Sequence, residues 1–170
     1  MNKALILAVI ITATVLPSSA HEWVRINRQN VLTWKNFDPR LVKEMQGKAD
    51  SIGVVYGKFY SDKFTDAALL SKQNGRLIFE VVRCNPECNI DIHTDISDGM
   101  RGIRFVADGL TYLILVPKGQ VVETTPAIEG ENKHVKLKHD AIEVVTFEKA
   151  SVVWYWDDKT KKWDTISTAD

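Results

Sequence analysis

The sequence predicts a mainly β fold, a single compact antiparallel β domain with one short N-terminal helix. Three observations lead to this prediction. Short runs of β-branched and aromatic residues fill the chain after Ser51. Asn-Gly and Asp-Gly pairs between such runs are typical of two-residue hairpin turns. One segment before Ser51 has the end signals and the apolar face of a helix.

The predicted helix covers residues 37–46, FDPRLVKEMQ. Asp38 is a suitable N-cap, and Pro39 has the fixed φ that favours the first helical position. The apolar residues that follow share one face, and Gly47 is a stop signal. We therefore expect a short helix that packs against the β body.

Asn74-Gly75 predicts the first hairpin, because both residues tolerate the positive φ of a tight turn. The two strands, 67–73 and 76–83, should be adjacent and antiparallel. A further strand is expected at 89–97, where isoleucines alternate with polar residues.

Asp108-Gly109 predicts a second hairpin, within residues 102–116, by the same argument. The stretch 123–133 contains Pro and Gly among polar residues and is expected to be an exposed loop. Four more short strands are predicted in the segments HVKLKH, AIEVVTFE, SVVWYW and WDTIST.

Residues 1–20 have the composition of an export signal, with a basic start, an apolar run and small residues at the end. The apolar run is shorter than the ~20 residues that a membrane-spanning helix needs, and no membrane span is expected. We expect cleavage to leave His21 first and residues 21–170 as one β-rich domain. The predicted location is periplasmic or secreted.

Charge gives no indication of a nucleic-acid or lipid partner. The chain has 22 basic and 22 acidic residues, and the two signs are interspersed.

The two cysteines, Cys84 and Cys88, lie in the segment CNPEC. An exported chain meets an oxidising compartment, so a local disulfide around Pro86 is expected. A redox-active pair is disfavoured because three residues separate the cysteines, not two, and no helical pattern follows Cys84.

Residues 57–69, GKFYSDKFTDAAL, resemble the GDFNGDGxxDxAV core of FG-GAP and VCBS-type repeats, whose loop holds calcium between two strands. In this register Lys58 and Tyr60 replace calcium ligands, and Asp62 and Asp66 are the side-chain ligands that remain. Calcium takes six to eight oxygen ligands, so we expect a degenerate loop, a structural turn without a cofactor. The matching positions are Gly57, Phe59, Asp62, Thr65, Asp66 and Ala68.

The C-terminal stretch from His139 resembles the ends of small exported bacterial proteins with FG-GAP-like segments. One such loop, with no repeat at a fixed period, favours a single compact domain over a full propeller. The resemblance implies a non-catalytic extracytoplasmic module.

The aromatic residues of this stretch include Trp154, Trp156 and Trp163. Strand alternation places Trp154 and Trp156 on one face and Tyr155 on the other. These tryptophans either pack in the core or form an interaction surface.

Metal binding is the main alternative. A mature N-terminal His21 could chelate copper through its amine and ring, with His93, His134 or His139 completing the site. Residual calcium binding at Asp62 and Asp66 is the second form of this alternative.

The strand at 89–97 also gives Asp91, His93 and Asp95 the same parity, so they should share one polar face.

No catalytic sequence motif accompanies these features. A nucleophile elbow, a phosphate-binding glycine loop and a zinc-protease motif are all missing from the sequence. The sequence therefore favours an exported, non-enzymatic binding module that acts on a protein partner. One concrete form is an inhibitor or immunity protein against a cell-wall-active enzyme.

Overall fold

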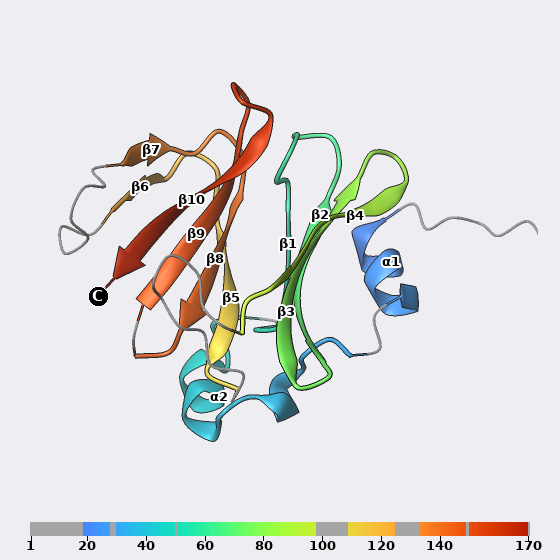
Figure 1. The fold of residues 1–170 in the computed structure, drawn as a ribbon, viewed down its shortest axis with the longest axis vertical. Helices are drawn as coiled ribbons and strands as arrows, with labels where there is room; N and C mark the ends of the chain where they lie inside the picture. Colours follow the sequence, from blue (N-terminus) through green and yellow to red (C-terminus); the bar gives the residue numbers. More distant parts are fainter. Residues whose placement is uncertain are drawn as a thin grey trace, which may run out of the picture.

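The structure, a computed structural model, describes residues 19–27, 30–49, 51–97, 109–124, 133–148 and 150–169. In these ranges the chain forms two four-stranded sheets, a two-stranded ribbon and two short α-helices (Figure 1). All strand pairs within the sheets are antiparallel. The mainly β, antiparallel class that the sequence predicts is therefore confirmed.

The first sheet is a meander in which each strand pairs with the next one along the chain. The predicted hairpin at Asn74-Gly75 joins its second and third strands, with φ of 51° and 79° at the two turn residues. Its strands are β1 (Val54–Gly57), β2 (Asp66–Gln73), β3 (Arg76–Cys84) and β4 (Cys88–Asp95).

The second sheet has the order β10-β9-β8-β5 and contains three of the four strands predicted after residue 133. The fourth, β7, forms a ribbon with β6, a strand that the sequence did not predict. The elements are β5 (Thr111–Val116), β6 (Val121–Glu123), β7 (His134–Lys136), β8 (Ala141–Thr146), β9 (Ala150–Asp157) and β10 (Lys162–Ala169).

Two sequence predictions fall partly outside the described residues. The second strand of the predicted hairpin at 102–116 is β5, but its first strand lies in 101–108, which the structure does not describe. Most of the predicted loop at 123–133 also lies outside, in 125–132.

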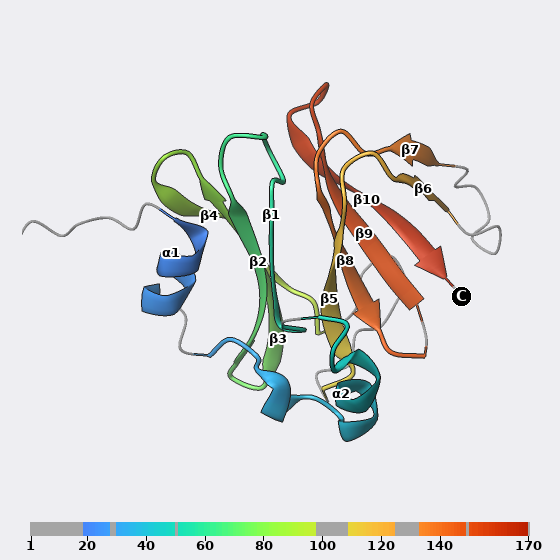
Figure 2. The ribbon, with the colours of Figure 1, turned by 180° about the vertical axis from the view of Figure 1, so that it is seen from behind.

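Both sheets follow the same plan, which the views from front and back show (Figures 1 and 2). Each begins with the strand nearest the other sheet, β1 or β5, and continues outward by successive antiparallel pairs. An Asp-Ala pair lies at the beginning of the second strand in both: Asp66 is the first residue of β2, and Asp140 directly precedes β8, which begins at Ala141. The β6–β7 ribbon is inserted between the first and second strands of the second sheet. One backbone hydrogen bond, from Leu113 N–H to the Ile52 carbonyl (2.9 Å), joins the two sheets beside β1 and β5.

The main core lies between the sheets and includes Phe59, Phe79, Leu113 and Ile142, all nearly or fully buried. Phe59 comes from the β1–β2 loop, and its ring lies so close to Gly57 that a Cβ there would be 2.5 Å from Phe59 Cε1. Glycine is therefore required at the end of β1. The buried ring anchors the loop that carries the candidate site.

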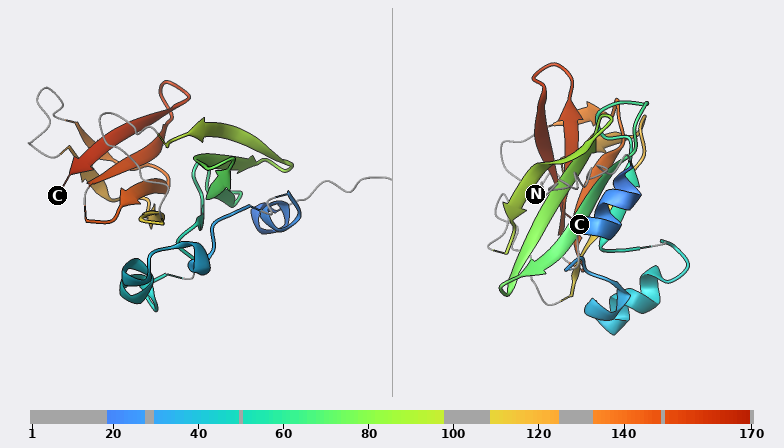
Figure 3. Two further views of the ribbon diagram at one scale, coloured as in Figure 1. Left: turned by 60° about the horizontal axis from the view of Figure 1, so that its bottom comes forward. Right: turned by 90° about the vertical axis from the view of Figure 1, so that its right-hand side faces the viewer.

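The predicted helix is α2 (Pro39–Met45), at one end of the two sheets (Figure 3). Asp38 caps it by accepting a hydrogen bond from Arg40 N–H at 2.8 Å, and Gly47 follows with φ of 81°. Asp38 N–H also donates to the Gly109 carbonyl (3.1 Å), which ties the helix start to the residues before β5.

A second helix, α1 (Ala20–Asn27), was not predicted. The Ser19 side chain accepts a hydrogen bond from Glu22 N–H (3.3 Å), and Ala20 is completely buried. This helix therefore runs across the predicted cleavage position before His21. Neither α1 nor α2 is long and apolar enough to cross a membrane, and the described residues contain no other α-helix.

Candidate functional site

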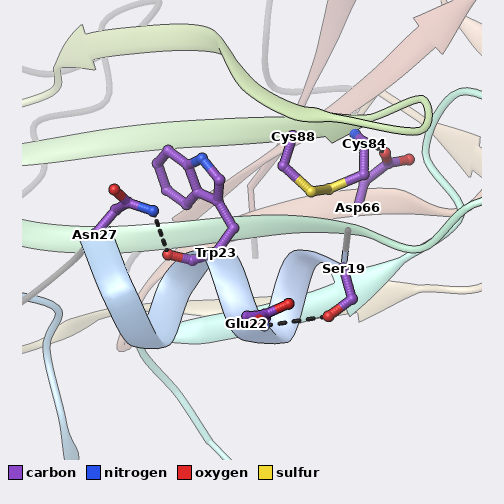
Figure 4. The surroundings of a disulfide bond; sticks show 7 residues. All are labelled: Ser19, Glu22, Trp23, Asn27, Asp66, Cys84 and Cys88. Carbon is purple, nitrogen blue, oxygen red and sulfur yellow. Dashed lines mark hydrogen bonds between the residues drawn. A yellow bond between two sulfur atoms is a disulfide. The ribbon is translucent and has the colours of Figure 1, made fainter. Parts of the chain in front are cut away.

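The β1–β2 loop is held by the carboxylate of Asp66, which is 1% exposed. One oxygen accepts a hydrogen bond from Phe59 N–H (3.1 Å), and the other accepts from Cys84 N–H (2.9 Å). Figure 4 shows Asp66 beside Cys84. Burial raises the pKa of Asp66 to about 6, against the opposing effect of these hydrogen bonds.

Asp62, the other candidate ligand of this loop, has a different environment. It is exposed and pairs with Lys118 Nζ at 2.7 Å. The two aspartates therefore bind separate partners, Asp66 inside the protein and Asp62 on its surface. Lys58 donates its backbone N–H to Asp140 at 2.8 Å. Within the described ranges, no three His, Cys, Asp or Glu side chains are grouped as a metal site requires.

Tyr60 is the centre of a hydrogen-bonded group. It occupies a position where the calcium loop of FG-GAP and VCBS-type repeats has a ligand. Its hydroxyl donates to Asp91 Oδ2 at 2.5 Å. Trp163 Nε1–H lies 2.9 Å from the Tyr60 oxygen and 3.0 Å from Asp91 Oδ2. Burial, followed by the bond to Asp91, raises the pKa of Tyr60, so its hydroxyl remains a proton donor.

Arg83 lies over the aromatic rings of this group. Its guanidinium carbon is 4.5 Å from the centre of the Tyr60 ring and 5.7 Å from that of Trp156. Such contacts fix the guanidinium plane by cation–π attraction. In the described part of the chain, its side-chain N–H groups form no hydrogen bond. We call Tyr60, Arg83, Asp91, Trp156 and Trp163 the Tyr60 cluster.

A cleft of about 330 Å³ opens beside the Tyr60 cluster, on the tip of the β3–β4 hairpin. Its walls have donors, acceptors and both signs of charge, and Ile90, 43% exposed, adds an apolar contact. The lining residues are Arg83, Asn85, Glu87, Asn89, Ile90 and Asp91.

Asp91 reaches the Tyr60 cluster because β4 contains a β-bulge. Val81 pairs with Ile92 and Val82 pairs with Ile90, so Asp91 has no residue opposite it. The prediction that Asp91 shares one face with His93 and Asp95 is therefore wrong, while His93 and Asp95 still pair with residues two apart on β3, Glu80 and Ile78. His93 Nδ1 instead lies 2.7 Å from a carboxylate oxygen of the buried Glu80, and Asp95 pairs with Arg76 at 2.6 Å.

The three tryptophans of the predicted interaction surface lie on the side of the second sheet that packs against the main core. Trp154 contacts Phe79, with ring centres 5.2 Å apart. Trp156 and Trp163 are directly opposite each other in the β9–β10 pair and are half-buried. Tyr155 points to the opposite face, as alternation predicted, and donates to Asp164 at 2.9 Å.

Cys84 and Cys88 form the expected disulfide, which joins residues directly opposite each other in the β3–β4 hairpin. Both cysteines are buried, and they pack with Trp23 of α1 in a second, smaller core (Figure 4). The disulfide therefore links β3 to β4 at the hairpin tip that carries the cleft.

The histidines considered for copper are not brought together. His21 lies within α1, and its ring stacks on Tyr56 at 3.7 Å. His139 pairs with Asp158, and His134 pairs with Glu123.

A larger groove, of about 660 Å³, lies between α1, the end of α2, β1 and β5. Its lining is mainly apolar, and its polar side chains include His21, Lys48, Ser51 and Tyr56. The described groove residues do not form a convergent polar group comparable to the Tyr60 cluster, so its size alone does not make it the stronger candidate.

Sequence reasoning identified Trp156 and Trp163 but missed Tyr60, Arg83 and Asp91 as members of the site. Tyr60 had a detectable signal, because an aromatic residue occupies a position where the resembled loop has a ligand. Arg83 and Asp91 had no such signal. The position of Asp91 depends on the bulge in β4, and the contact of Arg83 with Trp156 depends on the packing of the two sheets.

Comparisons with protein-family models, with curated proteins and with solved structures find no match to this chain.

Proposed function

We propose that this protein is an exported, non-enzymatic binding module and that the Tyr60 cluster with its adjoining cleft is its recognition surface. The observation that carries the proposal is Arg83, whose guanidinium is fixed on two aromatic rings while its N–H donors have no acceptor in the described residues. Trp, Tyr and Arg are the residue types that contribute most to binding energy at protein interfaces.

The chemistry of the cleft supports a protein partner that places a carboxylate against Arg83. A guanidinium binds a carboxylate through two parallel hydrogen bonds, and an arginine already held in place loses less side-chain entropy in doing so. Glu87 and Asp91 also line the cleft, and their carboxylates can accept hydrogen bonds from the same partner or pair with its cationic side chains. Ile90 supplies apolar area at the rim.

A more specific form of the proposal is inhibition of, or immunity to, a cell-wall-degrading enzyme. Glycoside hydrolases commonly use a pair of carboxylates that flank the bond to be cleaved. Arg83 at the rim of a rigid β domain is complementary to such an acidic site.

Affinity capture with matched variants tests the general proposal. Wild-type protein and the variants Arg83→Ala and Val121→Ala are immobilised and incubated with extract of the native cell envelope, and bound proteins are quantified by mass spectrometry. Val121 is an exposed apolar residue outside the cleft and serves as the control. We expect a protein retained by wild type and Val121→Ala but depleted on Arg83→Ala. A partner retained equally by all three would refute the assignment of the surface.

The specific form is tested by inhibition. A lysozyme-type glycosidase and other cell-wall hydrolases are assayed on cell-wall suspensions with a stoichiometric amount of the protein. Inhibition that Arg83→Ala abolishes is expected. Full hydrolase activity across the panel would rule out this form, while the capture experiment would still decide the general one.

A further inference from the structure

We propose that the free edge of β4 belongs to the recognition surface: an extended segment of the partner pairs with it as an additional antiparallel strand and places an acidic side chain against Arg83. The proposal deepens the proposed function and rests on it, because it names the kind of segment that the cleft would bind. Two features carry it, an unpaired strand edge and the continuity of that edge with the cleft.

β4 is the outermost strand of the first sheet, which has the order β1-β2-β3-β4 (Figure 3). One edge of β4 bonds to β3, and among the described residues no backbone hydrogen bond reaches its other edge. Several of its residues, Asn89, Ile90, Asp91 and His93, are exposed. An exposed strand edge presents N–H and C=O groups with which another chain can pair.

The hydrogen bonds to β3 indicate which backbone groups of β4 face outward. Ile96 N–H donates to the Leu77 carbonyl at 2.9 Å, and in an antiparallel pair the bonded residues alternate with residues that make no bond to the neighbouring strand. Thr94 therefore also bonds to β3, whereas the N–H and C=O groups of His93 and Asp95 point away from it. Each of these two residues offers a donor and an acceptor at the spacing of an added strand.

The free edge leads directly into the cleft. Asn89, Ile90 and Asp91 belong to both, because they lie in β4 and line the cleft. A strand antiparallel to β4 runs towards the cleft, so its last residues enter it. There a carboxylate meets the guanidinium of Arg83, which is held on two aromatic rings.

The β-bulge at Asp91 limits what can pair with this edge. Bulges interrupt and twist an edge strand, and this is one way in which proteins avoid long edge-to-edge pairing between copies. The carboxylates that a second β4 would bring already have partners, since Asp91 binds the Tyr60 hydroxyl and Asp95 binds an arginine of β3. A partner segment with a carboxylate of its own is therefore a better match to the charge of Arg83 than a second copy of this chain.

Hydrogen exchange, followed by NMR in the full, isotopically labelled chain, tests the edge without a partner. The amides of His93 and Asp95 should exchange faster than that of Thr94 by about tenfold or more, because only Thr94 is bonded within the sheet. Equal protection of the three amides would mean that the edge is covered and would overturn the proposal.

A synthetic strand peptide tests the pairing itself. The probe is N-acetyl-Thr-Val-Thr-Val-Thr-Glu-amide, and its control ends in Gln. We expect saturable NMR shifts of the His93 and Asp95 amides and of Arg83 Nε–H, with an affinity about tenfold lower for the Gln peptide, because the charged acceptor is lost. Shifts at Arg83 alone would refute pairing at the edge and leave the cleft as a carboxylate site. No shift at millimolar peptide would also overturn the proposal.

His93→Pro and His93→Ala separate the backbone donor from the side chain. Both remove the contact with Glu80, but only proline removes the outward N–H, and an edge strand tolerates proline where its N–H would face solvent. His93→Pro should bind the peptide, and the protein captured from the cell envelope, about tenfold more weakly than His93→Ala. Equal binding would refute the role of the edge.

The outcomes distinguish this proposal from the proposed function. A captured protein that depends on Arg83 but binds both His93 variants equally would leave the proposed function standing without the edge. If capture fails to depend on Arg83, the proposed function fails, and the peptide titration still decides whether the edge accepts a strand. A dimer that His93→Pro dissociates would show that a second copy occupies the edge and would overturn the assignment to a partner. Because exchange and titration use the wild-type protein, they decide the proposal even if His93→Pro fails to fold.

Discussion

At the residue scale, one buried carboxylate, that of Asp66, organises the β1–β2 loop through hydrogen bonds. Asp66 uses both of its oxygens to bind backbone N–H groups from two different segments. Tyr60 of the same loop donates a hydrogen bond from its hydroxyl to Asp91. The loop is therefore held by hydrogen bonds to Asp66, and it places Tyr60 in the Tyr60 cluster.

Replacing Asp66 by alanine should lower stability and remove part of its pH dependence. The folded-state pKa of about 6 exceeds the ordinary 3.8, so the native state binds more protons between these values. Stability from this group is therefore greatest below about pH 4 and decreases as pH rises through 6, by an amount on the order of 3 kcal/mol. Urea unfolding of wild type from pH 4 to pH 7 should show this decrease.

In Asp66→Ala this slope should disappear, and at pH 7 the free energy of unfolding should fall by about 2–3 kcal/mol, because two buried N–H groups lose a charged acceptor. Asp62→Ala is the matched control and should keep the wild-type slope. An Asp66→Ala protein as stable as wild type would contradict the role given to this carboxylate.

Calcium should not stabilise the protein. Asp66 is committed to backbone donors, and Asp62 is paired with the Lys118 ammonium. A ligand that binds only the folded state raises the melting temperature by mass action. Thermal melts with and without millimolar calcium should therefore coincide. A calcium-dependent rise that Asp66→Ala eliminates would restore the metal-binding alternative.

The sequence could predict the turn at Asp66 but not the cluster that the turn supports. The Asp66 side chain acts within a few residues of its own loop and on the adjacent strand, and this local chemistry is visible as a pattern. The sheet face on which Asp91 lies depends on a one-residue bulge, which strand alternation alone does not predict. Trp163 meets Tyr60 only because two sheets pack together.

At the element scale, the β3–β4 hairpin tip depends on the disulfide and on α1, which packs over it. Cys84, Cys88 and Trp23 belong to one small core on the side of the first sheet that faces α1. The helix itself had a sequence signal, because Ser19 and Glu22 have the spacing of a capping box and the Ser19 side chain accepts from Glu22 N–H. The same residues also fit the cleavage region of an export signal, and the sequence prediction followed that interpretation.

The double variant Cys84→Ala/Cys88→Ala should fold and be less stable. A disulfide that closes a loop this short is expected to contribute about 2 kcal/mol by restricting the unfolded chain. The measurement is the free energy of unfolding in urea, with reduced wild-type protein as a second form of the same change. Unchanged stability in both would show that the bridge does not constrain the hairpin.

At the scale of the whole molecule, two meanders of the same plan face each other across the main core, and the Tyr60 cluster lies where their side chains meet. Periodicity and turn chemistry predicted most strands and the hairpin at Asn74-Gly75, because these depend on neighbouring residues. They did not predict the division into two sheets. That division follows from long-range contacts such as Leu113 with Ile52 and Asp140 with Lys58, which leave no local pattern.

Hydrogen–deuterium exchange on the complex with the captured partner tests the central claim most directly. Amides of residues 58–61 and 83–91 should exchange more slowly in the complex than in the free protein, because they surround the Tyr60 cluster and the cleft. Residues 121–123, at the exposed edge near Val121, should be unchanged. Protection confined to 121–123 or to α1, with 83–91 unaffected, would contradict the assignment of the recognition surface.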